Sequence, residues 1–593
     1  MIPSPRIDGY APIEEYAVLT DGRTCALISL DGRIDWWPVP TLDSLPVCAA
    51  LLDAESGGFL SLSPISPSVV ERRYVAGTNV LESVFTTVDG SVRVTSALNM
   101  ASSGRLPWTE LALRVEGISG DVTMEWVLSP HTHFETPCVS TIEQGIPVVR
   151  CGTHTIAALF DGESDIEVAP EKVSATFTLK PGEKAVLAFI ASDGEPIFVP
   201  TLTEIDGRVD ATKENWSRWS AKISPTHQWS DAVVRSALVL KSLLAEYTGA
   251  IAAAATTSLP ERIGGPKNWD YRFAWVRDSS FAINALVNLE LSEEVHNAVA
   301  WLLRAIGRNG PDLHVFYTLA GEIPAGEEKL DLAGYRGSQP VRSGNRAAHQ
   351  RQLGNYGDVF DAVYRYVKEG NVLDVTSQEL LSELAQRCCN EWRNPDSGIW
   401  ELPTTEHYTI SKIGCWVALD RAVKLHEMNQ VRDGEVARWR RERDAVREYI
   451  ERECWSEEKK SYTFYAGTDD LDASVLLSAR TGFDVGTRLA STIEAISREL
   501  RDGPLVYRYT GAREGEGAFV ACTFWLVQAL AGSGQREEAI RLMDEAVGLT
   551  NDVGILAEQI DPQTRAFLGN VPQALSHLAL ISAARSIDAS EQA

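Results

Sequence analysis

Hydrophobic and polar residues alternate along about the first 200 residues of the chain. The segment 80–88 follows this two-residue period and leads through Asp89-Gly90 into a second alternating segment, 91–96. Asp-Gly between two such segments is a strong hairpin signal, because both residues tolerate the backbone angles of a tight turn. Further β-rich runs span 110–115, 122–128, 148–159 and 174–190, with turns such as Lys180-Pro181-Gly182 among them. The pattern predicts an antiparallel β-sandwich.

From about residue 230 the hydrophobic period becomes that of an α-helix. About twelve amphipathic segments follow, with approximate starts at 230, 279, 293, 356, 377, 409, 435, 469, 485, 517, 536 and 572. The segment 519–530 is apolar on more than one face, which indicates an inner helix, whereas the densely charged segment 439–451 indicates an outer one. Alternating inner and outer helices predict a closed, double-layered barrel of six hairpins.

The change of period divides the chain into a β-sandwich over 1–200, a helical linker over 201–229 and an all-α barrel over 230–593. A chain of 593 residues exceeds the usual size of a single domain, so a multidomain protein is expected. The longest predicted loop, 308–355, lies in the helical part. Loops of that length in a compact domain are usually functional.

Acidic residues outnumber basic ones, with 82 Asp and Glu against 55 Lys and Arg and a formal charge of −27. This charge repels phosphate backbones and anionic bilayers, so neither nucleic acid nor a membrane is an expected partner. The N-terminal residues lack the basic and apolar regions of an export signal, and no apolar run is long enough to span a bilayer. We therefore expect a cytoplasmic protein; whether it forms a homo-oligomer stays open.

The nine cysteines show neither Cys-x-x-Cys spacing nor a disulfide framework, so they are predicted to be buried thiols. His131 and His133 are one residue apart on a predicted strand, but the sequence offers no third ligand near them. We expect no metal and no organic cofactor.

Two segments far apart in the chain each carry a glutamate suited to hydrolysis: 396–401, which ends in Trp400-Glu401, and 556–562, which contains Glu558. Cleavage of a glycosidic bond needs one carboxyl that protonates the leaving oxygen and a second that attacks the anomeric carbon or activates water. Trp400 can form an apolar wall that raises the pKa of Glu401. Glu558 has polar sequence neighbours, among which it is expected to stay ionised.

The strongest single motif spans 259–278, where aromatic residues alternate with charged ones immediately before a predicted helix. Tyr271 and Trp275 are among the aromatics, and the segment ends in Arg277-Asp278. A sugar needs flat apolar surfaces against its ring and charged groups for its hydroxyls, and this segment supplies both.

With this motif the chain resembles glycoside hydrolase family 15, the group that includes glucoamylases and the bacterial and archaeal trehalases related to them. The resemblance covers nearly the whole chain. The segments 13–24 and 31–37 resemble the trehalase-like N-terminal domain of that family. Further matching segments are 334–345, 411–412, 416–422 and 568–577.

The resemblance implies an (α/α)6 barrel and an inverting mechanism, with Glu401 as general acid and Glu558 as general base. It also implies substrate-binding roles for seven residues. Arg277 and Asp278 match a pair that grips the non-reducing glucose, and Tyr271 matches an aromatic near the oxocarbenium-like centre. The other expected substrate contacts are Trp275, Arg336, Trp400 and Arg508.

Glu401 is followed by Leu402-Pro403, where many relatives place Arg-Gly, and this stretch is expected to line the leaving-group side. The expected partner is a small carbohydrate, with trehalose first and maltose-type glucans, isomalto linkages and other α-glucosides open. Two rival functions are an inverting disaccharide phosphorylase, against which Glu558 argues, and a non-catalytic carbohydrate-binding protein.

Overall fold

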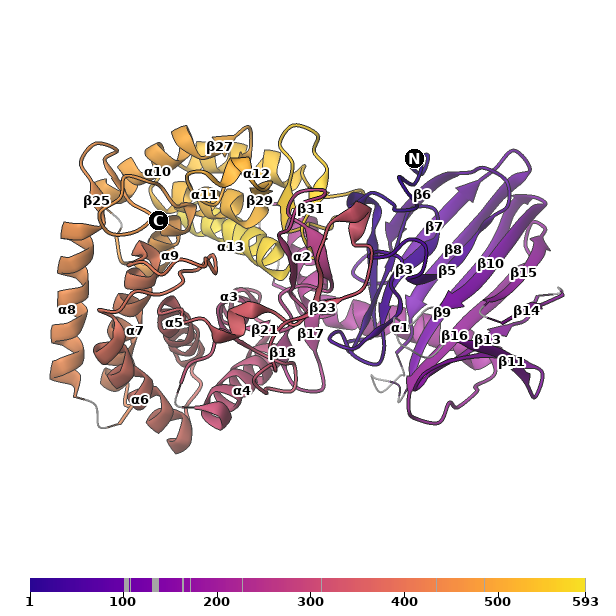
Figure 1. The fold of residues 1–593 in the computed structure, drawn as a ribbon, viewed down its shortest axis with the longest axis horizontal. Coiled ribbons are helices and arrows are strands. Elements are labelled where there is room, and N and C mark those ends of the chain that lie inside the picture. Colours follow the sequence, from indigo (N-terminus) through magenta and orange to yellow (C-terminus); the bar gives the residue numbers. More distant parts are fainter. Residues whose placement is uncertain are drawn as a thin grey trace.

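A computed structural model describes residues 1–100, 106, 108–130, 138–162, 165–170, 172–224, 226, 228–310, 312–432, 435–484 and 486–591. The predicted pair His131 and His133 lies outside these residues. Figure 1 shows two parts side by side, namely sheets built from the first part of the chain and a helical body built from the rest. The predicted change from β to α structure is confirmed.

Two antiparallel sheets form the N-terminal part. The first contains, in spatial order, β1 (Ala17–Thr20), β2 (Cys25–Ile28), β3 (Arg33–Pro38), β5 (Gly58–Pro64), β10 (Val122–Pro130), β15 (Lys172–Leu179) and β14 (Glu167–Ala169), with β4 (Pro46–Cys48) paired to β3. The second contains β11 (Val139–Glu143), β12 (Ile146–Cys151), β13 (His154–Phe160), β16 (Lys184–Asp193), β9 (Thr109–Gly120), β8 (Gly90–Leu98), β7 (Leu81–Thr86) and β6 (Val69–Tyr74).

The hairpin predicted at Asp89-Gly90 is confirmed, because β7 pairs with β8 in a register that places Thr86 opposite Ser91. The run 148–159 is not one strand. It contains β12 and β13, joined by a turn in which Gly152 has a φ of 60°, a conformation that glycine adopts without steric cost. Lys180-Pro181-Gly182 lies in the turn between β15 and β16, as predicted.

Thirteen α-helices lie within the described residues. They are α1 (Leu202–Ser220), α2 (Ser230–Leu243), α3 (Val276–Asn288), α4 (Ser292–Asn309), α5 (Gly354–Lys368), α6 (Val375–Glu391), α7 (Thr409–Glu427), α8 (Val436–Glu453), α9 (Ser478–Thr481), α10 (Thr487–Glu499), α11 (Val520–Gly532), α12 (Arg536–Val547) and α13 (Ala574–Glu591). The long helix predicted near 469 is wrong, since a 3₁₀ helix, η4 (Ala473–Leu477), and the single turn of α9 occupy that place.

Successive buried helices pack against one another: α3 against α5, α5 against α7, α7 against α9, α9 against α11, α11 against α13, and α13 against α3. The predicted positions of two helices are confirmed. Nearly every residue of α11 is buried, so it is an inner helix. In α8 only Trp439, Val446 and Ile450 are buried, so its charged face meets solvent.

Polar contacts join the sheets to the helical body close to the segments that carry the candidate chemistry. The Trp36 indole donates to the carbonyl of Ala255 at 2.9 Å, and Arg272 donates to the carbonyl of Ser44 at 2.9 Å. Glu14 accepts a hydrogen bond from the backbone of Phe567 at 3.3 Å. The N-terminal part therefore supports segments of the helical body that lead to the candidate site.

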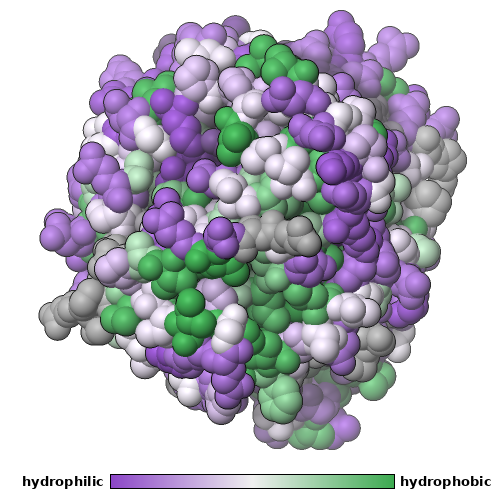
Figure 2. Space-filling model, turned by 90° about the vertical axis from the view of Figure 1, so that its right-hand side faces the viewer, coloured by the Kyte–Doolittle hydropathy of each residue, from purple (hydrophilic) through white to green (hydrophobic). Residues whose placement is uncertain are grey.

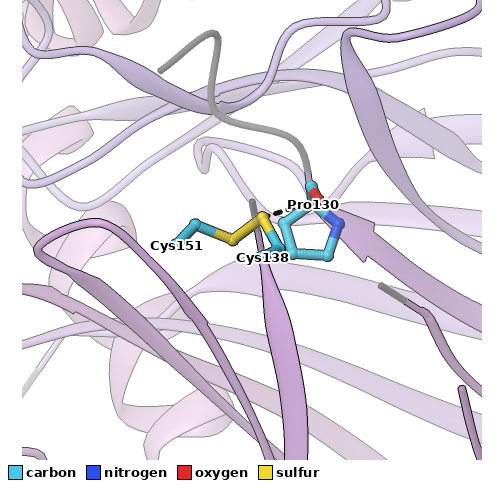
Figure 3. Close-up of a disulfide and its surroundings, with 3 residues drawn as sticks. All are labelled: Pro130, Cys138 and Cys151. Carbon is cyan, nitrogen blue, oxygen red and sulfur yellow. Dashed lines mark hydrogen bonds between the residues drawn. A yellow bond between two sulfur atoms is a disulfide. The ribbon is translucent and has the colours of Figure 1, made fainter. Parts of the chain in front are cut away.

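The prediction that all cysteines are thiols is wrong. Cys138 and Cys151 form a disulfide that joins the start of β11 to the end of β12, beside Pro130 (Figure 3). Antiparallel pairing brings these two residues together, which their spacing in the sequence did not reveal. The other seven cysteines are free and buried, as predicted.

The surface at the sheet end of the molecule is largely hydrophilic, with hydrophobic residues gathered in its lower half (Figure 2). Among the described residues of β11, Val139 and Ile142 are exposed. Within the described ranges no helix is long and apolar enough to cross a membrane.

Arg72 of β6 and Asp552, in the loop after α12, form a bidentate ion pair between the two parts, with both N–O distances at 2.7 Å. The Arg72 side chain is only 1% exposed. Asp552→Asn should destabilise the protein by about 1–3 kcal/mol, since it leaves this guanidinium buried without an anion. We expect the midpoint of thermal unfolding to fall by about 2–4 °C, measured by calorimetry.

The matched control is Glu116→Gln, which removes the partner of Arg93 in a pair where both side chains are about 40% exposed. It should change stability by less than about 0.5 kcal/mol. Equal midpoints for Asp552→Asn and the wild type would show that the interface does not depend on this pair.

Candidate active site

Two adjoining cavities lie at the end of the helical body that carries the long loops. They share Tyr271, Trp400, Glu401 and Arg508. The smaller, inner cavity is also lined by Ala253, Trp275, Arg277, Asp278, Ile399, Phe519, Gln573 and Leu575. The outer cavity has a volume of about 330 Å³ and is also lined by Glu261, Pro266, Lys267, Trp269, Arg342, Asn345, Arg346, Ala347, Leu402, Pro403 and Tyr509.

The aromatic motif is fixed by short strands immediately before α3. Trp275 ends β21 (Ala274–Trp275), which pairs with β22 (Phe316–Tyr317), and its ring stacks on Phe316 at 4.3 Å. Tyr271 packs edge-on against Trp275 at 5.1 Å. Arg272 points away from the cavities and pairs with Asp270 at 2.7 Å. Alternation thus directs the aromatic residues into the site and the charged residues between them into the scaffold.

Glu401 lies at the junction of the two cavities, in a turn where its φ is 58°. Its Oε1 accepts a hydrogen bond from the Trp275 indole at 2.6 Å and lies 3.6 Å from Nη1 of Arg277. Burial raises the pKa of Glu401, and Arg277 opposes that shift. The predicted direction of the shift is confirmed.

The side chain that contacts the Glu401 carboxyl is not Trp400, from which an apolar wall was expected. Trp275 contacts the Glu401 carboxyl, while the Trp400 indole donates to Asp472 at 2.8 Å. The Trp400 ring packs on Phe519 and Trp525, with centroid distances of 5.4 Å and 5.9 Å. Trp400 therefore forms a fixed wall shared by both cavities.

Arg277 and Asp278 occupy the first turn of α3 and pair with each other at 3.0 Å. Arg277 also donates to the carbonyl of Ile399 at 2.7 Å, which ties α3 to the turn that carries Glu401. Both residues line the inner cavity, so their charged groups face the space that a small ligand would occupy.

Glu558 precedes β30 (Gln559–Ile560), the middle strand of a small sheet with β29 (Ala518–Phe519) and β31 (Phe567–Leu568). It is 1% exposed, and its Oε2 accepts a hydrogen bond from the backbone of Asn570 at 3.0 Å. Its Oε1 has no hydrogen-bond partner among the described residues. The pairing of Gln559 with Phe519 places the segment of Glu558 next to a residue that lines the inner cavity.

The prediction that Glu558 stays ionised in a polar setting is wrong. Burial raises its pKa to about 8, and the negative charge of Glu261 adds to the shift. The polar neighbours expected from the sequence supply one backbone donor to its carboxyl, which is too little to offset burial.

Tyr271 links the two candidate carboxyls. Burial raises the pKa of its phenol, and the next contributions come from Glu558 and then Glu401. The phenol thus lies within electrostatic range of both glutamates, although one residue comes from the loop before α7 and the other from the loop before α13. Both glutamates therefore affect the same phenol, and of the two only Glu401 lines a cavity.

A network of charges includes residues that line the outer cavity, and the sequence analysis did not identify it. Arg508 donates to Glu261 at 2.9 Å and to Glu516 at 2.6 Å, and Lys267 donates to Glu516 at 2.6 Å. Burial opposes ionisation of Glu516, but Arg508 and Lys267 outweigh it and hold its pKa at about 2. Burial raises the pKa of Glu261 to about 7. Glu261 and Lys267 belong to the motif 259–278, so the sequence contained a signal for two members of this network.

Of the predicted site residues, those that line a cavity are Tyr271, Trp275, Arg277, Asp278, Trp400, Glu401 and Arg508. Glu558 and Arg336 line neither cavity. Arg336 follows Tyr335 in a short 3₁₀ turn, with a φ of 49°, within electrostatic range of Glu14. Leu402 and Pro403 line the outer cavity, the side expected for the leaving group.

No group of three or more His, Cys, Asp or Glu residues able to hold a metal ion occurs in the part of the chain that the structure describes.

Comparison with known proteins identifies the class. Residues 228–585 match the family model for glycosyl hydrolases family 15, and residues 8–211 match the model for the trehalase-like N-terminal domain. The chain belongs to glycosyl hydrolases family 15 and is a glycoside hydrolase that acts on O-glycosyl bonds. The resemblance inferred from the sequence motifs is confirmed.

Similar curated proteins include the trehalase of Mycolicibacterium smegmatis, which is 34% identical over 97% of this chain and 91% of that protein. The trehalase of Thermoplasma volcanium is 28% identical over 98% of this chain and 94% of its own length. Among solved structures, a bacterial glucoamylase complexed with acarbose aligns with a TM-score of 0.76 over 100% of this chain and 97% of that chain, at 13% identity. The similarity to this glucoamylase shows a shared fold and nothing more.

The raised pKa of Glu558 predicts a pH-dependent stability difference. In the folded state this carboxyl is protonated up to about pH 8, whereas an unfolded glutamate ionises near its usual value of about 4.3. Its contribution to stability is therefore present at low pH and is lost as the pH rises towards 8. Glu558→Gln imitates the protonated form, so the variant should melt higher than the wild type by a few degrees at pH 8.

The difference in melting temperature between Glu558→Gln and the wild type should shrink towards pH 5, because the unfolded glutamate then approaches its own pKa of about 4.3. Scanning fluorimetry across this range measures it. Glu514→Gln, at an exposed carboxyl, is the control and should follow the wild type at each pH. A variant that melts at the same or a lower temperature than the wild type at pH 8 would contradict the assignment.

Proposed function

We propose that this protein hydrolyses α-linked glucosides from their non-reducing end with inversion at the anomeric carbon, and that trehalose is its leading substrate. The observation that carries the proposal is Glu401 at the junction of the two cavities, with Glu558 within electrostatic range of the same Tyr271 phenol. The relatives named trehalase match nearly the whole chain, which supports this choice of substrate.

We infer that the helical body is an (α/α)6 barrel with α3, α5, α7, α9, α11 and α13 inside. The succession of contacts among these helices and the fold likeness to the glucoamylase support this inference. The proposed domains are a β-sandwich over 1–200, a linker over 201–229 and the barrel over 230–593. Helix α1 of the linker packs on β9 and β16 of the second sheet.

The inner cavity is suited to one glucose unit. Arg277 and Asp278 offer charge-assisted hydrogen bonds to sugar hydroxyls, and the rings of Tyr271, Trp275 and Trp400 offer apolar faces. The leaving group then occupies the outer cavity, and the bond to be cleaved lies beside Glu401, which borders both spaces.

Glu401 acts as general acid in this scheme. Burial raises its pKa, which favours the protonated form that a general acid needs. It transfers that proton to the leaving oxygen as the C1–O bond breaks, and Trp275 and Arg277 then stabilise the carboxylate that remains.

Glu558 acts as general base. Its Oε1 has no partner among the described residues, so it is the oxygen available to a water molecule. The water oxygen bonds to C1 on the face opposite the leaving group, and Glu558 accepts the proton that the water loses. Low solvation and the nearby Glu261 make the Glu558 carboxylate a stronger base than an exposed one.

Replacing either glutamate by glutamine should remove activity. Glu401→Gln and Glu558→Gln should each lower kcat on trehalose by at least about a thousandfold, because each amide retains the shape of the side chain but transfers no proton. Glucose release measures the loss, and calorimetry should show trehalose binding within a few-fold of the wild type. The control is Glu406→Gln, in the same loop as Glu401 but outside both cavities. A variant of either glutamate with near-normal kcat would refute its role.

Inversion makes a stereochemical prediction. Each turnover on trehalose should release one β-glucose, from the unit whose anomeric carbon is attacked, and one α-glucose, from the leaving group. Proton NMR within the first minutes should therefore show the two anomers in equal amounts before mutarotation. Initial release of α-glucose alone would indicate retention and exclude the proposed mechanism.

A further inference from the structure

The outer cavity is lined by basic side chains although the protein as a whole is acidic. Lys267, Arg342, Arg346 and Arg508 border it, and the carboxyl groups in its lining are Glu261 and Glu401. The complete chain has a formal charge of −27, so this concentration of cations runs against the overall composition. A cavity lined in this way attracts anionic ligands in preference to neutral ones.

Three of these cations are compensated by neighbouring carboxylates. Arg508 pairs with Glu261 and Glu516, and Lys267 pairs with Glu516 at 2.6 Å. Arg342 pairs with Glu327.

Arg346 differs from the other three. It is exposed, and no carboxylate of the described residues forms an ion pair with it. Its guanidinium lies 4.5 Å from the centre of the Trp269 ring, and that of Arg342 lies 4.7 Å from the same ring. Two guanidinium groups on one indole leave an uncompensated positive charge at the wall of the cavity.

The pKa of Arg342 reflects this arrangement. Burial lowers its pKa, and the positive charge of Arg346 lowers it further, against the opposing effect of Glu327. An anion bound at Arg346 would relieve this repulsion.

We propose that the outer cavity accepts a leaving group that carries a phosphate, so that the protein also removes unmodified glucose from α-glucosides of sugar phosphates. The proposal rests on the proposed function, since it uses the same inner cavity and the same two glutamates. Arg346 recognises the phosphate, with Arg342 beside it on Trp269. A guanidinium matches phosphate oxygens in bidentate geometry.

The chemical step is the proposed hydrolysis and needs no additional reactant. Water supplies the oxygen that bonds to C1, Glu558 takes its proton, and the C1–O bond to the leaving sugar breaks as Glu401 protonates that oxygen. The phosphate ester stays intact and departs with the leaving sugar. The products of trehalose 6-phosphate are therefore glucose and glucose 6-phosphate.

The test compares trehalose 6-phosphate with trehalose as substrates of the wild type and of Arg346→Gln. We expect kcat/KM on trehalose 6-phosphate to exceed that on trehalose in the wild type and to fall at least tenfold in the variant. The loss on trehalose should be smaller, so the preference for trehalose 6-phosphate over trehalose should disappear in the variant. The matched control is Arg441→Gln, which removes the same charge from an exposed residue of α8 outside the cavity.

Binding to the Glu401→Gln protein supplies a second readout without turnover. Trehalose 6-phosphate should bind this protein at least tenfold more tightly than trehalose, and the preference should disappear when Arg346→Gln is added. Equal losses on both substrates in Arg346→Gln, or no preference for the phosphorylated sugar in either assay, would overturn the proposal.

Adding inorganic phosphate to the assay distinguishes a site for free phosphate from a site for a phosphate ester. If phosphate accelerates trehalose cleavage through Arg346, or if glucose 1-phosphate is formed, the cations serve free phosphate and the proposal is overturned. Competition by phosphate against trehalose 6-phosphate, with trehalose unaffected, supports it. If the proposed hydrolytic function itself is wrong, neither disaccharide will release glucose. That result can be distinguished from a failure of the phosphate proposal alone.

Discussion

The arrangement of the site depends on one buried arginine, Arg508. It lines both cavities and pairs with Glu261 and Glu516, and Lys267 adds a second positive charge at the edge of this network. Without these cations the buried Glu516 could not stay ionised, because an isolated buried charge carries a large desolvation penalty. Burial raises the pKa of Glu558 and Glu261 adds to that shift, whereas Arg508 opposes it.

The N-terminal sheets contribute to the site although no residue of theirs lines either cavity among the described residues. They support it through the scaffold: Ser44 accepts a hydrogen bond from Arg272 within the aromatic motif, and Glu14 accepts one from Phe567 in the strand that follows Glu558. The segments that carry Glu401 and Glu558 are loops, whose positions depend on what they contact. The N-terminal sheets therefore form part of the frame that holds these loops.

Much of the fold could be predicted from the sequence, because helices and strands leave local periodic signals. The hairpin at Asp89-Gly90 and the inner position of α11 followed from residues close together in the chain. The predictions that failed depended on distant contacts. Cys138 meets Cys151 only because β11 and β12 pair, and the pattern near 469 that suggested a long helix is a 3₁₀ turn followed by the short α9.

The sequence by itself determined the class of protein and most of the lining of the site. Residues such as Tyr271, Arg277 and Glu401 lie in contiguous motifs whose chemistry can be recognised without coordinates. Only the tertiary structure decided the electrostatic state of the site. Glu261, Arg508 and Glu558 are distant in the chain, and ionisation depends on burial and on distances to other charges, which no local pattern encodes. The same reason applies to Arg346, whose lack of an anionic partner among the described residues becomes visible only when the cavity is assembled.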